Sequence, residues 1–193
     1  GNSLFIDSEL QVAEKDEKKY SGQFVNSALS LSKDNSSAAI IGGGDGGVAR
    51  ELSSKGFDLI DWYELDPEVV RVCQKHLLKV CGDIKANNKV KTYWGDAFES
   101  IKKVKDAKYD KIFVDLNDDQ FCINLAAKNM KGLKRILKPG GIITAQVGCM
   151  SKKPKQVKNW MELLKTNFGN VELKEVFIPS FDCRWNFASS THK

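Results

Sequence analysis

The chain has 193 residues, of which 41% are hydrophobic and 28% are charged, a composition that excludes a disordered or fibrous protein. The 30 Lys and Arg against 25 Asp and Glu leave a net charge of only +5, too small and too scattered to predict a nucleic-acid-binding surface. No apolar run approaches the roughly 20 residues that a membrane-spanning helix needs.

The chain opens with two short alternating apolar stretches, Leu4–Ile6 and Leu10–Ala13, separated by the turn residues Asp7 and Ser8. This pattern predicts a β-hairpin. A helix is expected to follow from about Glu17 to Leu31, because its apolar residues recur at helical spacing.

From residue 38 onward the patterns of strands and helices alternate. Strands are expected at residues 38–41, 59–65, 90–94, 109–116 and 142–147, and the final pair at 171–178 and 185–189. Helices are expected at residues 48–55, 67–78, 98–104, 122–137 and 156–168, with the run Lys138-Pro139-Gly140-Gly141 ending the fourth of them. The alternation predicts an α/β fold with a doubly wound, mostly parallel sheet and an antiparallel C-terminal edge.

The first corner between a strand and a helix is rich in glycine and runs from Gly42 to Gly47. Glycines allow a tight turn and a close approach to a ligand, and the position of this cluster is typical of nucleotide binding. Asp45 interrupts the glycines with a carboxylate, which suits a cationic ligand better than a phosphate. Asp45 is equally well explained as a helix cap.

Acidic residues follow the next three strands, where ligands of such sheets bind. Glu64 stands 22 positions after Gly42, where an acid binds ribose hydroxyls. Asp96 is placed to accept from an exocyclic amine, to cap the next helix, or both. Asp115 and Asp118 stand in a run of acidic and amide side chains. Burying their charged carboxylates at a sheet edge costs free energy unless they contact cations or water. A loop of solvated acids is the alternative.

These residues together resemble the spermidine synthases, the aminopropyltransferases of polyamine synthesis. The resemblance runs through nearly the whole chain. It covers residues 4–11, 14–17, Tyr20, 40–47, 64–66, 95–96, Asp115, Asp118, Gln146, 178–181 and 185–189. The specific part is the glycine corner with Asp45, together with the opening hairpin. Glu64 and Asp96 are shared with many methyltransferases.

The resemblance implies a Rossmann-like, methyltransferase-type fold. It also implies that residues 1–16 are a remnant of the family's β domain and residues 17–193 the catalytic domain. The co-substrate would be decarboxylated S-adenosylmethionine, and no metal is expected. The cofactor-binding residues would be Gln11, Gly42, Gly44, Asp45, Glu64, Asp96 and Ala97. The catalytic residues would be Asp115, Tyr20 and Asp118, transferring the aminopropyl group to a diamine such as putrescine and giving spermidine and methylthioadenosine.

The acceptor half departs from the family pattern. Ser21, Gly148 and Phe181 replace a glutamine, a glutamate and a tyrosine that are common in the family, and the loop at residues 119–123 has no Gly or Pro. The identity of the amine therefore stays open. Two alternatives remain: an S-adenosylmethionine-dependent methyltransferase on the same fold, and a relative that has an altered acceptor or has lost activity.

Two further expectations concern surroundings and partners. The densest basic run is predicted to be a solvated loop and helix face; it comprises Lys152, Lys153, Lys155 and Lys158.

The five cysteines form no C-x-x-C pair and the N-terminus shows no secretory h-region, so we expect reduced thiols and a cytoplasmic protein. The expected partner is a small-molecule polyamine, with no nucleic acid and no membrane. The resemblance allows a homodimer and leaves the oligomeric state open.

Overall fold

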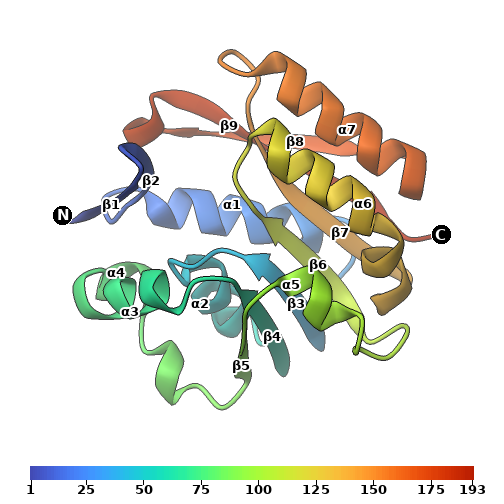
Figure 1. Ribbon diagram of the computed structural model, residues 1–193, viewed down its shortest axis with the longest axis horizontal. Coiled ribbons are helices and arrows are strands. Elements are labelled where there is room, and N and C mark those ends of the chain that lie inside the picture. The colour runs from blue at the N-terminus through green and yellow to red at the C-terminus, as the bar shows by residue number, and fades with distance from the viewer.

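The computed structural model covers residues 1–193 and contains nine strands and seven α-helices. The strands are β1 (Ser3–Ile6), β2 (Glu9–Ala13), β3 (Ser37–Gly42), β4 (Leu59–Glu64), β5 (Val90–Trp94), β6 (Tyr109–Asp115), β7 (Leu137–Cys149), β8 (Glu172–Ile178) and β9 (Cys183–Thr191). The helices are α1 (Glu17–Leu29), α2 (Gly47–Ser54), α3 (Pro67–His76), α4 (Leu78–Cys81), α5 (Ala97–Ile101), α6 (Gln120–Ile136) and α7 (Pro154–Phe168). Figure 1 shows their arrangement.

Seven strands form one sheet in the order β5-β4-β3-β6-β7-β9-β8. The first five of these are parallel, and β9 runs antiparallel between β7 and β8. The expected parallel sheet with an antiparallel C-terminal edge is confirmed. The chain order reverses between β3 and β6, and ligands of doubly wound sheets bind at this reversal, outside the carboxyl ends of the strands.

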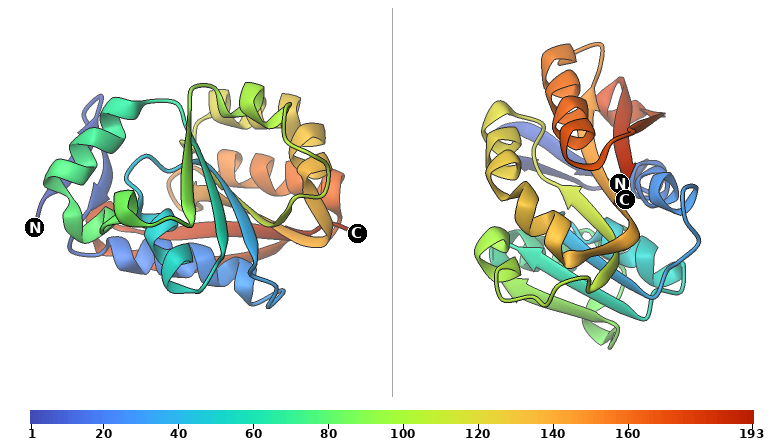
Figure 2. Two further views of the ribbon diagram at one scale, coloured as in Figure 1. Left: turned by 90° about the horizontal axis from the view of Figure 1, so that it is seen from below. Right: turned by 90° about the vertical axis from the view of Figure 1, so that its right-hand side faces the viewer.

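Helices cover both faces of the sheet (Figure 2). One face packs on α1 and α2 through a cluster of 17 buried residues that includes Phe24 and Leu52. The other face packs on α6 and α7 through a cluster of 22, including Met130 and Trp160. Because both faces of the central strands are covered, the strands read as continuous apolar runs rather than alternating ones.

The hairpin β1–β2 forms a separate two-stranded sheet, as predicted, and packs beside α3 and α4. Val12 belongs to a small apolar cluster with Leu77 and Val80. At the end of the hairpin, buried Asp16 accepts hydrogen bonds from the Ser180 N–H (2.6 Å) and Ser180 hydroxyl (2.8 Å). These contacts hold the hairpin over the carboxyl edge of the sheet.

Some predicted bounds were wrong. The helix expected at residues 98–104 ends at Ile101, and the strand expected at 185–189 runs over Cys183–Thr191. The helix expected to reach Leu78 ends at His76; α4 and a 3-10 turn at Ile84–Ala86 follow it, unpredicted. The run 138–141 does end α6, but it belongs to β7 rather than to a loop. Main-chain hydrogen bonds with His192 fix this extension. The Gly140 N–H donates to the His192 carbonyl at 2.7 Å, and the His192 N–H donates to the Gly141 carbonyl at 2.8 Å. Contacts with the far end of the chain override the local turn signal. None of the helices combines the length and the apolar composition that a membrane span requires.

Candidate active site

The carboxyl ends of the parallel strands open into a pocket of about 940 Å³. The hairpin forms one wall, and the segment from Ser180 to Trp185 forms another. All ten residues predicted from the sequence to bind or react line this pocket: Gln11, Tyr20, Gly42, Gly44, Asp45, Glu64, Asp96, Ala97, Asp115 and Asp118. The predicted residues therefore converge on a single cavity, although Gln11 and Asp118 are 107 positions apart in the sequence.

The glycine corner brings the ends of β3 and β6 together. Gly43 N–H donates to the Asp115 carbonyl at 3.1 Å. Gly42 has φ +84°, and a Cβ there would lie 2.4 Å from the same carbonyl oxygen. A Cβ on Gly44 would lie 2.9 Å from Val69 Cγ1 and 3.2 Å from Glu64 Oε2. Only glycine allows this approach, so the corner is shaped by sterics as well as by turn geometry.

Asp45 lies just beyond this approach, and its Oδ1 accepts from Gly47 N–H at 2.6 Å. The N-cap residue of α2 is Gly46 and no side chain caps the helix, so the helix-cap alternative for Asp45 was wrong; its hydrogen bond to the first residue of α2 holds the turn before the helix. Burial, and then the nearby charge of Asp115, raise the pKa of Asp45 to about 8. The charged form of this carboxyl group is only weakly compensated, by Arg50, and a cationic ligand would stabilise it further.

Asp115, at the end of β6, is paired with a tyrosine from α1. Tyr20 donates its hydroxyl proton to Asp115 Oδ1 at 2.7 Å. Burial raises the pKa of Asp115 to about 6, while this hydrogen bond opposes the rise. Burial and the charge of Asp115 raise the pKa of Tyr20 well above its usual value. Tyr20 therefore stays protonated and orients a carboxylate that can take up a proton near neutral pH.

At the other end of the pocket, Glu64 is buried and accepts from Asp66 N–H at 2.9 Å. Burial raises the pKa of Glu64. Asp96 caps α5 by accepting from Phe98 N–H at 2.7 Å, with Ala97 beside it. Gln11 extends from the hairpin, where its amide donates to the Glu9 carbonyl at 3.2 Å. These groups line the pocket together with exposed apolar side chains, of which Phe121 is 74% and Leu65 71% exposed.

Two lysines of the basic run also line the pocket, which the sequence interpretation missed. Lys153 Nζ lies 3.1 Å from Asp118 Oδ1, and Lys152 Nζ donates to the Phe181 carbonyl at 2.7 Å. Both follow the carboxyl end of β7. That position was the available signal, because loops after parallel strands form the ligand site. Lys155 and Lys158 are exposed, as expected.

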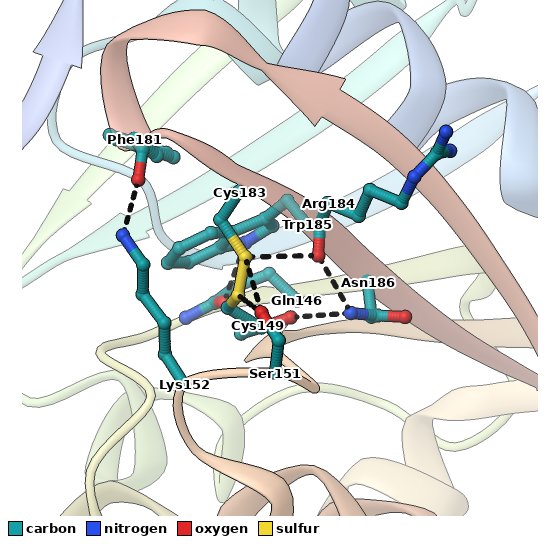
Figure 3. Close-up of a disulfide and its surroundings, with 10 residues drawn as sticks. Gln146, Cys149, Ser151, Lys152, Phe181, Cys183, Arg184, Trp185 and Asn186 are labelled. Carbon is teal, nitrogen blue, oxygen red and sulfur yellow. Dashed lines mark hydrogen bonds between the residues drawn. A yellow bond between two sulfur atoms is a disulfide. The ribbon is translucent and has the colours of Figure 1, made fainter.

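The expectation of reduced thiols was wrong for two of the five cysteines. Cys149 and Cys183 form a disulfide, with Cα atoms 6.3 Å apart (Figure 3). Cys73, Cys81 and Cys122 are free. No spacing motif marks the pair, because it depends on the register that places Cys149 opposite Trp185 in adjacent strands. The disulfide joins the end of β7 to the start of β9, and Cys149 lines the pocket.

Replacing Cys149 and Cys183 by serine is expected to lower the free energy of unfolding of the oxidised protein by about 4 kcal/mol, because the pair closes a loop with a sequence separation of 34. Urea unfolding with and without a reductant measures this loss. Cys122→Ser, which changes a free cysteine, is the control. Equal stability of the oxidised wild type and the double variant would contradict the prediction.

Comparisons with known proteins extend these observations. A family model described as the spermine/spermidine synthase domain matches residues 17–193. A polyamine aminopropyltransferase of Prochlorococcus marinus (strain MIT 9215) is 34% identical over 200 residues, which cover 98% of this chain and 69% of the relative. Polyamine aminopropyltransferase 2 of Aquifex aeolicus (strain VF5) is 32% identical over 184 residues, covering 93% of this chain and 37% of the relative.

Two solved structures share the fold. A spermidine synthase in complex with the transition state analogue AdoDATO superposes with a TM-score of 0.89 at 20% identity, covering 97% of this chain and 65% of that one. The spermidine synthase of Thermotoga maritima gives a TM-score of 0.87 at 20% identity, with 97% and 64% covered. The chain thus spans somewhat under two thirds of these solved chains.

Proposed function

Since the chain belongs to the spermine/spermidine synthase family, we propose that it transfers an aminopropyl group from decarboxylated S-adenosylmethionine to a small amine. The observation that carries this proposal is Asp45, a carboxyl group in the glycine corner that faces the pocket, with its pKa raised to about 8. The family resemblance implies a diamine such as putrescine as the acceptor.

The nucleoside part of the donor fits the end of the pocket near β4 and β5. Glu64 is placed to accept from the ribose hydroxyls, as an acid at the end of the second parallel strand does. Asp96 and the main chain at Ala97 are placed to bind the adenine edge. Gln11 lines the pocket from the hairpin, and we assign it a contact with the donor. Leu65 and Phe121 offer apolar surfaces for the base, and such surfaces are otherwise unfavourable in water.

The aminopropyl arm of the donor ends in an ammonium, which we assign to Asp45. The arm of ordinary S-adenosylmethionine carries a carboxylate on the same carbon. Two like charges about 4 Å apart repel by about 4 kcal/mol at an effective dielectric constant near 20. An ionised Asp45 would therefore favour the decarboxylated donor.

The reaction is a displacement at the propyl carbon bonded to sulfur. The lone pair of a neutral amine forms the new C–N bond while the C–S bond breaks and leaves its electron pair on sulfur, releasing methylthioadenosine. The proton lost by the amine passes to Asp115, whose orientation Tyr20 fixes at 2.7 Å. Asp118 lies three residues further on, at the acceptor side of the pocket. Alignment and proton acceptance are the two contributions that such a site supplies.

Incubation with decarboxylated S-adenosylmethionine and an amine panel is expected to release methylthioadenosine together with an amine heavier by one aminopropyl group. Mass spectrometry identifies both products. Ordinary S-adenosylmethionine in the same assay is the control, and it is expected to give neither product. Methylated amine and S-adenosylhomocysteine would instead identify a methyltransferase, and the absence of any product despite donor binding would identify an inactive relative.

A further inference from the structure

The acceptor end of the pocket, formed by Asp118, Lys152 and Lys153, contains two positively charged side chains. Lys152 and Lys153 precede α7 and are the two cationic side chains of the pocket lining. Lys153 is 40% exposed and Asp118 15% exposed at their side chains, and the ammonium lies 3.1 Å from Asp118 Oδ1. The protein thus neutralises its own carboxylate at this end of the site.

The backbone makes room for this pair. Gly148 has φ +86°, and a Cβ there would lie 2.5 Å from Asp118 Oδ2. Because position 148 has no side chain, the Asp118 carboxyl group occupies the space beside the end of β7, within reach of Lys153. The pair is therefore part of the pocket wall and does not depend on two freely solvated side chains meeting at the surface.

The other carboxylates that line the pocket lie away from the acceptor end. Glu64 ends β4, and Asp66 and Asp96 follow β4 and β5, at the nucleoside end of the pocket. Asp45 and Asp115 lie at the ends of the neighbouring strands β3 and β6. Glu9 is an exposed side chain on the hairpin. A diamine whose first nitrogen reacts beside Asp115 keeps an ammonium at its second nitrogen. At the acceptor end, the carboxylate available to that second ammonium is Asp118, which is already paired with Lys153.

Resting on the proposed aminopropyl transfer, we propose that Lys153 is a specificity-determining residue. Its ammonium takes the place on Asp118 that a second ammonium needs, so the site favours a primary amine whose far end is uncharged or anionic over a diamine of equal length. This replaces the diamine as the preferred acceptor. Lys152 strengthens the preference for an anionic far end, because its ammonium also lines the pocket, where it donates to the Phe181 carbonyl (Figure 3).

Three acceptors of matched length test the proposal: 1,4-diaminobutane, 4-aminobutan-1-ol and 4-aminobutanoate. The wild type is expected to show a kcat/KM for the diamine roughly five- to tenfold below that for the better of the other two, as expected for one partly exposed ion pair. In Lys153→Met the KM for the diamine should fall with kcat little changed, and the order should reverse. Lys155→Met, which removes an exposed lysine outside the pocket, is the control.

Isothermal titration calorimetry of the three amines with the protein saturated with methylthioadenosine gives the same ranking without turnover. A wild type that binds and uses the diamine best, with Lys153→Met binding it no better, would overturn the role of Lys153. Failure of all three amines to release methylthioadenosine would instead count against aminopropyl transfer itself, and the binding order would still report on Lys153.

Discussion

Asp115→Asn is expected to lower kcat by roughly 10²- to 10⁴-fold, the contribution of a positioned general base. The asparagine keeps an oxygen that can accept from the Tyr20 hydroxyl, so the geometry at 2.7 Å is conserved while the proton acceptor is lost. Release of methylthioadenosine under saturating donor and acceptor measures the effect. Binding of the donor should change little, because the substitution leaves the nucleoside end of the pocket intact.

The pH profile separates this role from a structural one. Burial raises the pKa of Asp115 to about 6, so its ionised form, which takes up the proton, is depleted below that pH. For the wild type, kcat/KM for the acceptor, calculated on the concentration of neutral amine, should fall about tenfold per pH unit below pH 6, the slope of one ionisation. Asp119→Asn, which changes a capping carboxylate outside the pocket, should stay within a few-fold of the wild type. A fully active Asp115→Asn would rule out the proposed base.

Asp45→Asn is expected to remove the preference for the decarboxylated donor. At pH 9 the carboxyl group of the wild type is ionised, and a repulsion of about 4 kcal/mol corresponds to a roughly 10³-fold weaker binding of ordinary S-adenosylmethionine. Asparagine retains an oxygen for Gly47 N–H, so the corner keeps its shape. The variant should bind the two donors with affinities within about tenfold of each other, as measured by calorimetry.

The selectivity of Asp45 should also depend on pH. With its pKa raised to about 8, the free carboxyl group is mostly protonated at pH 7 and binding an ammonium releases a proton. Selectivity of the wild type should therefore decrease from pH 9 to pH 6, whereas that of the variant should not change. Asp66→Asn, which removes a charge from the far end of the same pocket and keeps a helix cap, is the control. Equal donor preference in the wild type and Asp45→Asn would contradict the assignment.

Local patterns determine most of this fold. The apolar runs at β3, β4, β5 and β6 predicted those strands to within about two residues, and the proline at the start of α3 predicted where that helix begins, because each signal lies inside its own segment. The start of β7 was missed because it depends on His192, 52 positions after Gly140. Pairing with a distant segment leaves no mark in the local pattern.

The candidate site shows the same division. Acids at the ends of β4 and β6 could be found in the sequence because parallel strands end at one edge. The pair between Lys153 and Asp118 could not, because a lysine in a basic run has the composition of a solvent-exposed face. The disulfide between Cys149 and Cys183 was missed for a related reason, since it depends on the register of β7 with β9.

The hydrogen bond between Gly43 and the Asp115 carbonyl joins the strand end next to Asp45 to the strand end that positions the proposed base. A shift of either backbone would disturb both chemical groups together, so this region tolerates little redesign. Lys153 lies on a separate loop, past the end of β7. The amine preference of this scaffold can therefore diverge through one loop of the pocket wall while the residues for bond cleavage stay fixed, which makes residues 150–153 the natural place to engineer new polyamine-like products.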